Sequence, residues 1–216
     1  MLFRSGGDGY YGVEGGAPQD PYHPALYDRS VSGLDLRHIL TANTLYEIPV
    51  GKGKKFSTGS GAVDYILGNW QINNLFQTHS GVAFTPGISS DIANIGQGFL
   101  TTEHLNKVGS TGISHRSAAE WFNTANYAAP ALYTFGTAGR NSILGPSFWN
   151  LDMSLFRQFP VGEGRRIEFR AEAFNLFNHV DLGQPNSDLN SGSAFGTINS
   201  TASTARQLQL AGKFIF

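Results

Sequence analysis

The sequence predicts an all-β protein, an antiparallel up-and-down meander of about five long strands with long loops and one short helix. Three observations lead to this prediction. Polar and apolar residues alternate with a period of two in five separate runs, and each run ends in turn-forming residues. The runs are about 11 to 15 residues long, against about five or six for strands of soluble sheets. Short and long connections alternate between them.

The first two predicted strands lie within residues 34–51 and 69–84. Pro49 and Gly51 close the first. The second shows the cleaner alternation. One of its sides carries Trp70, Ile72, Phe76 and Thr78, and the other carries Gln71, Asn73, Gln77 and His79.

The remaining three predicted strands lie within residues 147–160, 165–179 and 205–216. The apolar sides of the first two of these carry Trp149, Leu151, Met153, Leu155, Ile167, Phe169, Ala171 and Ala173. The last run sets Leu208, Leu210, Gly212, Phe214 and Phe216 against Gln207, Gln209, Ala211 and Lys213. An apolar row that continues to the last residue is unusual, because chain ends normally fray into water.

The connections between the runs measure about 19, 62, 6 and 26 residues, which is the short-and-long layout of an outer-membrane barrel. Short periplasmic turns and long outer loops produce this alternation, and tilted membrane strands need about 9 to 11 residues. Within the longest connection, Ser117 and Glu120 form a capping box that predicts a short helix.

Composition excludes several classes of function. Charged residues make up 14% of the chain, against about 25% for a typical soluble domain. The 15 Lys and Arg nearly balance the 16 Asp and Glu, so we do not expect nucleic acid as a partner. The absence of cysteine excludes disulfides, thiolate metal sites and a cysteine nucleophile.

No catalytic or metal-binding motif is present in the sequence. The six histidines lack the spacing of metal ligands, and the glycine- and lysine-rich stretch at 50–61 lacks the GK-[ST] of a phosphate-binding loop. No G-x-S-x-G nucleophile signature occurs. We therefore expect no enzyme activity, no cofactor and no metal.

One strand carries a ladder of alternating charges, formed by Arg166, Glu168, Arg170 and Glu172. Its two carboxylates lie four residues apart, hence roughly 13 Å along a strand, which is farther than the acid pairs of glycosidases. Alternating signs instead indicate mutual neutralisation on a wall that faces water or a plug.

Several stretches together resemble one known family. They are "LDLRHILTANTLYEIPVGKGKKF", "ILGNWQINNLFQTHSGVAFTP", "EWFNTANYAAP", "FGTAGRNSILGPSFWNLDMSLFRQFPVGEGRRIEFRAEAFNLFNHVDLGQPN" and "FGTINSTASTARQLQLAGKFIF". In this order they resemble the C-terminal end of the β-barrel of TonB-dependent outer-membrane receptors, in particular the Oar-like group. The resemblance extends over nearly everything from about residue 25 onward.

The resemblance implies a barrel of about 22 strands around a plug, which imports scarce ligands with energy delivered through TonB. Because membrane barrels need at least about eight strands, we expect the chain to be a C-terminal fragment that is not active alone. Residues 1–34 would be an incomplete N-terminal loop segment, and 35–216 the C-terminal strands. The implied partners are outer-membrane lipid, the barrel-assembly machinery, TonB with the missing plug domain, and an unknown imported ligand.

The resemblance also implies roles for residues near the strand ends. Gln209, Ala211, Phe214 and Phe216 resemble the C-terminal signal read by the barrel-assembly machinery, with alanine where glycine is usual. Tyr46, Trp70 and Trp149 are candidates for the aromatic girdles of a membrane barrel. The alternative for these aromatic residues is the core of a soluble β-sandwich.

A different class of function is also compatible with the alternation of the strands. The chain could be a soluble or surface-displayed β-domain that acts as a binding or adhesion module. Its long loop, around residues 85–146, would then recognise the partner. Folding in water without detergent would favour this alternative.

Overall fold

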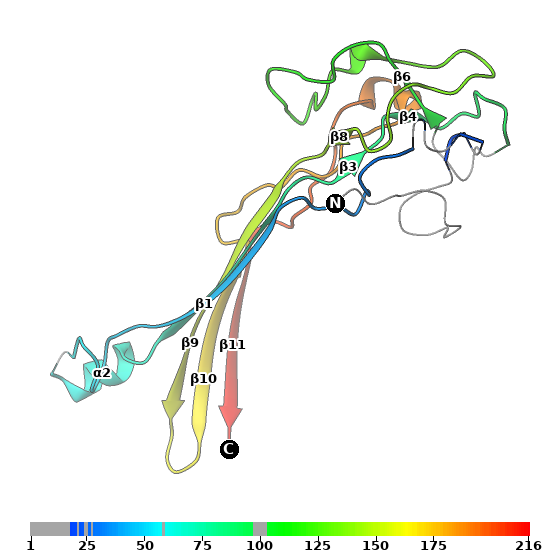
Figure 1. Ribbon diagram of the computed structural model, residues 1–216. Helices are drawn as coiled ribbons and strands as arrows, with labels where there is room; N and C mark the ends of the chain where they lie inside the picture. The colour runs from blue at the N-terminus through cyan, green and yellow to red at the C-terminus, as the bar shows by residue number, and fades with distance from the viewer. Residues whose placement is uncertain (1–17, 21, 24–25, 27, 58, 97–102) are drawn as a thin grey trace. The chain divides into compact units, whose positions relative to one another are not determined.

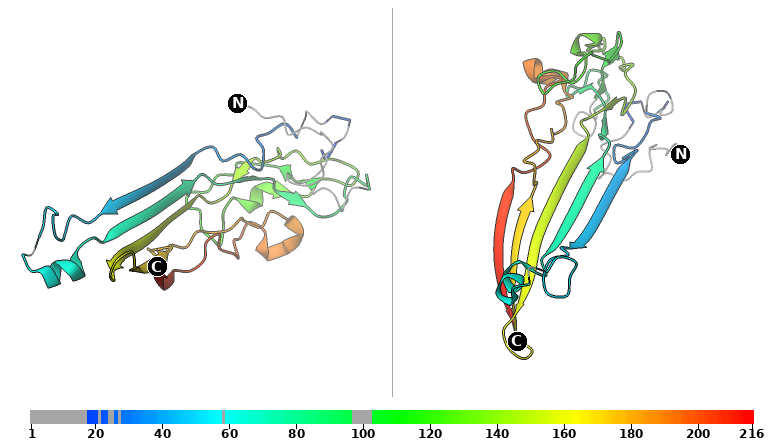
Figure 2. Two further views of the ribbon diagram at one scale, coloured as in Figure 1. Left: turned by 90° about the horizontal axis from the view of Figure 1, so that it is seen from below. Right: turned by 90° about the vertical axis from the view of Figure 1, so that its left-hand side faces the viewer.

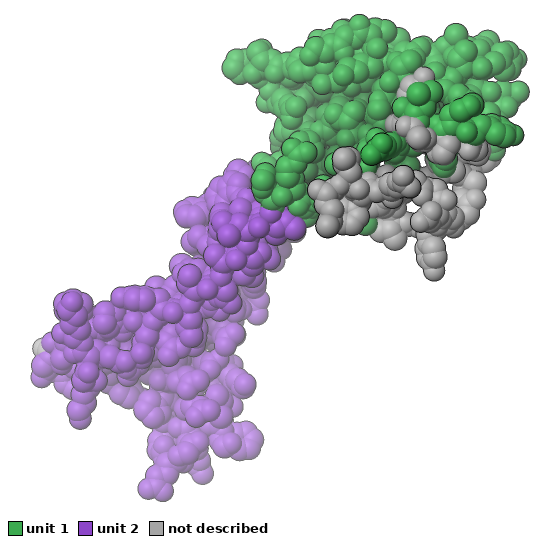
Figure 3. Space-filling view, in the orientation of Figure 1, with its two compact units in different colours: residues 1–38, 80–147, 182–202 green, residues 39–79, 148–181, 203–216 purple. Residues whose placement is uncertain are grey.

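The computed structural model describes residues 18–20, 22–23, 26, 28–57, 59–96 and 103–216, and the chain divides into two compact units. Unit 1 comprises residues 1–38, 80–147 and 182–202, and unit 2 comprises residues 39–79, 148–181 and 203–216 (Figure 3). Most of the predicted N-terminal loop segment, residues 1–34, lies outside the described residues.

Unit 2 is built on a five-stranded antiparallel sheet in which every strand pairs with its neighbour along the chain (Figures 1 and 2). The strands are β1 (Ile39–Glu47), β2 (Gln71–His79), β9 (Phe148–Pro160), β10 (Arg166–Phe174) and β11 (Gln207–Ile215), in the order β1-β2-β9-β10-β11. Each strand lies within one of the five alternating runs. The predicted all-β meander is therefore confirmed.

The register gives the sheet two chemically different faces, because side chains alternate between faces along a strand. One row across all five strands consists of Tyr46, Ile72, Leu155, Ala171 and Leu210, and its face is called the apolar face below. The adjacent row consists of Leu45, Asn73, Ser154, Glu172 and Gln209, and its face is called the polar face. The period-two pattern thus fixes one register for the whole sheet.

The two shorter connections, residues 48–70 and 161–165, leave one end of the sheet, and the two longer connections leave the other. At one end Glu47 pairs with Gln71, and the turn 161–165 joins β9 to β10. This turn uses Gly162 and Gly164 at φ values of 89° and 71°, in the left-handed region that glycine adopts without steric cost. At the other end, residues 80–147 and 182–202 depart into unit 1. The predicted alternation of connections is present.

The faces of the sheet are not covered by a second layer of unit 2. Among the buried apolar side chains of the described residues, only Ala173 belongs to the sheet. Leu210, in the middle of β11, is 74% exposed. A soluble sandwich would bury such an apolar row between two sheets, so this sheet lacks the core that the sandwich alternative requires.

Unit 1 has a hydrophobic core of its own, formed by Ile88, Leu105, Phe122, Tyr127, Ala138, Ile143 and Phe195. The ring of Phe122 lies at its centre, with its centroid 5.6 Å from that of Tyr127 and 5.2 Å from that of Phe195. Because these residues come from 80–147 and from 182–202, the two long connections fold against each other rather than extending separately.

The regular elements of unit 1 are short. Three two-residue strand pairs join β3 (Ala83–Phe84) with β8 (Ile143–Leu144), β4 (Gly87–Ile88) with β5 (Glu103–His104), and β6 (Asn106–Lys107) with β7 (Tyr127–Ala128). The described part of the unit also contains two 3₁₀ segments, η1 (Thr124–Asn126) and η2 (Leu189–Ala194).

The helix predicted after Ser117 is wrong. The capping hydrogen bond does form, since the Glu120 backbone N–H donates to Ser117 Oγ at 3.2 Å. The backbone N–H groups that follow donate to residues of other segments. Trp121 donates to the Gly196 carbonyl, and Asn123 donates to the Thr111 carbonyl. Hydrogen bonds to other segments thus replace the i→i−4 bonds of a helix.

An α-helix lies elsewhere, at α2 (Gly61–Leu67), between β1 and β2. Its N-cap residue, Ser60, is of a type that favours this position but makes no side-chain capping bond. Nowhere in the described parts of the chain does a helix have the length and apolar character needed to cross a bilayer.

Candidate functional site

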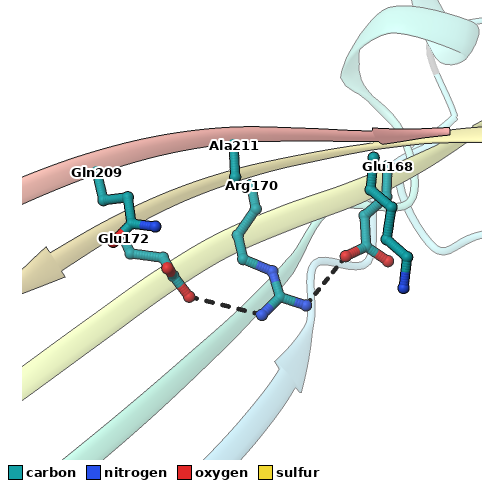
Figure 4. Close-up of a pocket in the computed structure, with 6 residues that line it drawn as sticks. Glu168, Arg170, Glu172, Gln209 and Ala211 are labelled. Carbon is teal, nitrogen blue, oxygen red and sulfur yellow. Dashed lines mark hydrogen bonds and ion pairs between the residues drawn. The ribbon is translucent and has the colours of Figure 1, made fainter.

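The charged ladder on β10 forms an ion-pair network on the polar face (Figure 4). Arg170 lies between two carboxylates, with Nη2 3.0 Å from Glu168 Oε1 and Nη1 3.5 Å from Glu172 Oε1. Gln158 on β9 donates to Glu168 at 2.9 Å. The structure therefore brings together three of the four predicted ladder residues. Arg166, exposed at the start of β10, makes no ion pair with another described residue.

The ladder lines a shallow depression between β10 and β11. The other lining residues are Gln209, Ala211 and Lys213. Ala211 lies directly across from Arg170 in the register, and both residues line the depression. The result is a hydrophilic surface whose charges largely balance. In the described residues, no cluster of three or more His, Asp or Glu side chains could hold a metal ion.

The girdle candidates lie at the two ends of the sheet. Tyr46 and Trp70 lie at the end with the short connections, where Trp70 contacts the rings of Phe159 and Phe169 at centroid distances of 6.4 and 6.1 Å. Trp149 lies at the opposite end, where its ring centroid is 4.3 Å from that of His179. Aromatic side chains thus mark both ends of the sheet.

The C-terminal residues form the outermost strand of the sheet. Gln209 and Ala211 lie on the polar face, whereas Phe214 lies on the apolar face. Phe216 follows β11, is 94% exposed, and stacks on Phe214 at a centroid distance of 6.0 Å. β11 remains paired with β10 up to Ile215, so the chain end is ordered by the sheet rather than frayed.

Arg157 is a residue that the sequence reasoning missed. It occupies a position on the apolar face of β9, opposite Phe169, and is only 2% exposed. Its guanidinium group donates to the backbone carbonyls of Tyr65 and Ile66 at the end of α2. An arginine at an apolar position of the alternating run is the signal that could have identified it.

Unit 1 contains a buried polar cluster around Asp28 and His104. His104 Nε2 lies 3.7 Å and Arg140 Nη1 3.9 Å from Asp28 Oδ1, while His104 Nδ1 donates to the Ala138 carbonyl at 2.8 Å. Burial raises the pKa of Asp28 to about 6, although the Arg140 charge opposes this rise. Burial lowers the pKa of His104 to about 4. Both groups therefore resist charging in the folded unit.

The two shifts are expected to oppose each other in the pH dependence of stability. From pH 3.8 to about 6, folded Asp28 keeps a proton that the unfolded chain releases, so its contribution to the free energy of unfolding falls as pH rises. From pH 4 to 6.5, unfolded His104 binds a proton that the folded state excludes, so its contribution rises with pH. The wild-type stability of unit 1 should change little across this window.

Two variants separate these opposing contributions. Asp28→Asn should leave unit 1 less stable as pH falls from about 6.5 to 4, whereas His104→Gln should make it more stable in acid. Native-state hydrogen exchange of unit 1 amides at several pH values measures both slopes. Equal slopes in the two variants would contradict the prediction.

A five-stranded meander with one exposed apolar face, balanced charges on the other and aromatic residues at both ends has the construction of an outer-membrane β-barrel wall. The model of the outer membrane beta barrel domain family matches residues 3–209. The chain therefore belongs to this family, and its location is the outer membrane. Comparison with curated proteins and with solved structures found no match.

Proposed function

We propose that the chain is the C-terminal segment of the barrel of a TonB-dependent outer-membrane receptor, a transporter that takes up a ligand across the outer membrane. The observation that carries this proposal is the sheet itself, whose apolar face carries exposed residues such as Leu208, Leu210 and Phe214 and whose two longer connections leave one end. The stretches of sequence that resemble TonB-dependent receptors support the proposal of this receptor class among outer-membrane barrels. The segment supplies wall and loops and is not active alone.

The two faces meet different partners in this proposal. The apolar face contacts outer-membrane lipid, where every backbone polar group needs a partner, so neighbouring strands pair with the free edges of β1 and β11. The polar face lines the lumen, and its ladder faces the plug, through which TonB acts. No catalytic step and no nucleic acid enters this function.

The short connections lie on the periplasmic side in this proposal, together with the C-terminus. The segments that form unit 1 then lie outside the cell, where the unknown ligand is met. Their packed core gives the ligand a fixed surface rather than a set of independent loops.

Fractionation of cells tests the proposal. The chain, expressed with its native upstream coding sequence in a Gram-negative host, is expected in the outer-membrane fraction with heat-modifiable mobility in gels. Recovery of the 216-residue chain as a soluble monomer with cooperative unfolding in water would overturn it. That outcome would favour the second candidate, a surface-displayed binding module, for which the packed core of unit 1 is the supporting observation.

Deletion of Phe216 is expected to impair assembly. We assign Gln209, Ala211, Phe214 and Phe216 to the signal read by the barrel-assembly machinery, and Phe216 is exposed and free to be read. The yield of heat-modifiable protein in the outer membrane measures assembly. Removal of exposed Leu132 in unit 1, by Leu132→Ala, is the control. An unchanged yield after deletion of Phe216 would contradict the assignment.

A further inference from the structure

The connection between β1 and β2, residues 48–70, is much longer than a turn requires. At the same end of the sheet, residues 161–165 join β9 to β10 with a tight turn. Several apolar side chains of this connection are exposed. They are those of Phe56, Val63, Tyr65, Ile66 and Leu67, of which Ile66 is 62% exposed. Within unit 2, the connection therefore presents exposed apolar surface.

The exposed charge of this connection is positive. Lys52 and Lys55 are exposed, whereas Lys54 pairs with Glu47 at 2.8 Å. The acidic residue of α2, Asp64, is buried and accepts a hydrogen bond from Ser57 Oγ at 2.8 Å. The carboxylates near the two exposed lysines are thus already engaged. Exposed lysines beside exposed apolar residues are typical of segments that lie in a membrane interface.

Arg157 fixes α2 to the apolar face of the sheet. Besides its bonds to the carbonyls of Tyr65 and Ile66, its guanidinium carbon lies 4.3 Å from the ring centroid of Phe159 and 5.9 Å from that of Trp70. Helix-terminal carbonyls otherwise lack intrahelical partners, and aromatic faces attract cations. Both terminal guanidinium nitrogens of this buried arginine therefore have carbonyl partners, although Arg157 lies on the apolar face and its Nε has no hydrogen-bond partner among the described residues.

The apolar surface of α2 is continuous with that of the sheet. The ring centroid of Tyr65 lies 6.0 Å from that of Phe159, and Tyr65 Oη donates to the Pro160 carbonyl at 3.2 Å. Trp70, which ends the connection, also contacts Phe169 on β10. A lipid layer that meets the apolar face would accordingly meet α2 at its boundary.

We propose that residues 48–57 and 59–70 form a membrane-interface anchor that binds an anionic phospholipid surface. The exposed apolar side chains enter the acyl boundary, and Lys52 and Lys55 reach the lipid phosphates. Arg157 holds α2 in the orientation that makes both contacts. This inference rests on the proposed function, because that function places the apolar face in lipid.

A fluorescence experiment tests the anchor, with the chain expressed together with its native upstream coding sequence so that the edges β1 and β11 can pair with neighbouring strands. The chain contains no cysteine, so single substitutions can be labelled selectively with an environment-sensitive fluorophore. Ile66→Cys reports on α2, Leu210→Cys reports on the apolar face, and Leu132→Cys, at a position 70% exposed in unit 1, is the control. In phosphatidylcholine vesicles containing phosphatidylglycerol, labels at 66 and 210 should be quenched by doxyl-labelled lipid, and the label at 132 should not.

The choice of lipid tests the charge contribution. Doxyl-labelled phosphatidylglycerol should quench the label at residue 66 more than doxyl-labelled phosphatidylcholine does. Lys52→Gln with Lys55→Gln should reduce this preference by about fivefold for each lysine removed. The matched control is Arg29→Gln with Lys107→Gln, two exposed cations of unit 1, which should leave the preference unchanged.

The outcomes separate the anchor from the proposed function. If the label at residue 210 contacts lipid and the label at residue 66 contacts water, the anchor is wrong, whereas the proposed barrel wall is still supported. Water contact at both positions overturns the proposed function as well. Equal quenching by the two lipids, unaffected by the lysine substitutions, overturns the assignment of an anionic lipid.

Discussion

Replacement of Phe122 by alanine is expected to lower the free energy of unfolding of unit 1 by about 3–5 kcal/mol. Phe122 is fully buried, and its ring contacts those of Phe84, Tyr127 and Phe195. These partners come from both long connections, so the cavity could close only if two segments moved together. Partial relaxation of this kind gives the larger costs among large-to-small substitutions.

Hydrogen exchange can measure this loss amide by amide. The Ala138 N–H, which donates to the Leu105 carbonyl across the core, should exchange much faster in the variant. Leu132→Ala removes a large apolar side chain at an exposed position of the same unit and should change stability by no more than about 0.5 kcal/mol. Similar exchange rates in both variants would show that Phe122 is not central to the core.

Substitution of Leu210 by arginine is expected to destabilise the sheet in a bilayer by about 2–4 kcal/mol. Leu210 lies near the middle of β11 on the apolar face, paired with Ala171. A cation at this depth would either lie in hydrocarbon or distort the bilayer to reach water. The cost should fall for the same substitution nearer to the strand ends, because the penalty depends on depth.

The neighbouring residue supplies the control. Gln209 lies on the polar face opposite Glu172, so Gln209→Arg adds the same side chain beside a carboxylate. In a urea titration of the protein in vesicles, we expect this variant to unfold at nearly the same urea concentration as the wild-type protein. Equal destabilisation by the two substitutions would mean that the faces do not differ in environment, and the assignment of lipid to the apolar face would fail.

The strands were predictable from the sequence because period-two alternation is a local signal that survives in the register. In β10 the prediction extends too far, since the run to His179 ends as a strand at Phe174. Asn175 adopts a φ of 50°, and its side chain bonds the backbone of His179 and Thr204. Asparagine favours this left-handed conformation, so a turn replaces the last residues of the run.

The packing of the long connections could not be read from the sequence. The core of unit 1 depends on contacts between residues far apart in the chain, and such contacts leave no periodic pattern. The same long-range bonds to Gly196 and Thr111 override the local capping signal at Ser117. Among the candidate site residues, the ladder was visible because its charges alternate within one strand. The role of Arg157 was not visible, since its partners come from α2.

The contact between Phe122 and Phe195 also constrains the order of folding. Phe195 belongs to the connection that follows β10, so the core cannot be completed until both long connections are present. Formation of this core requires closure of a long loop, and the chain loses conformational entropy in that closure before any core contact stabilises the unit. The core of unit 1 is therefore expected to form late in folding, and β11 is the one strand of the sheet that follows the second long connection along the chain.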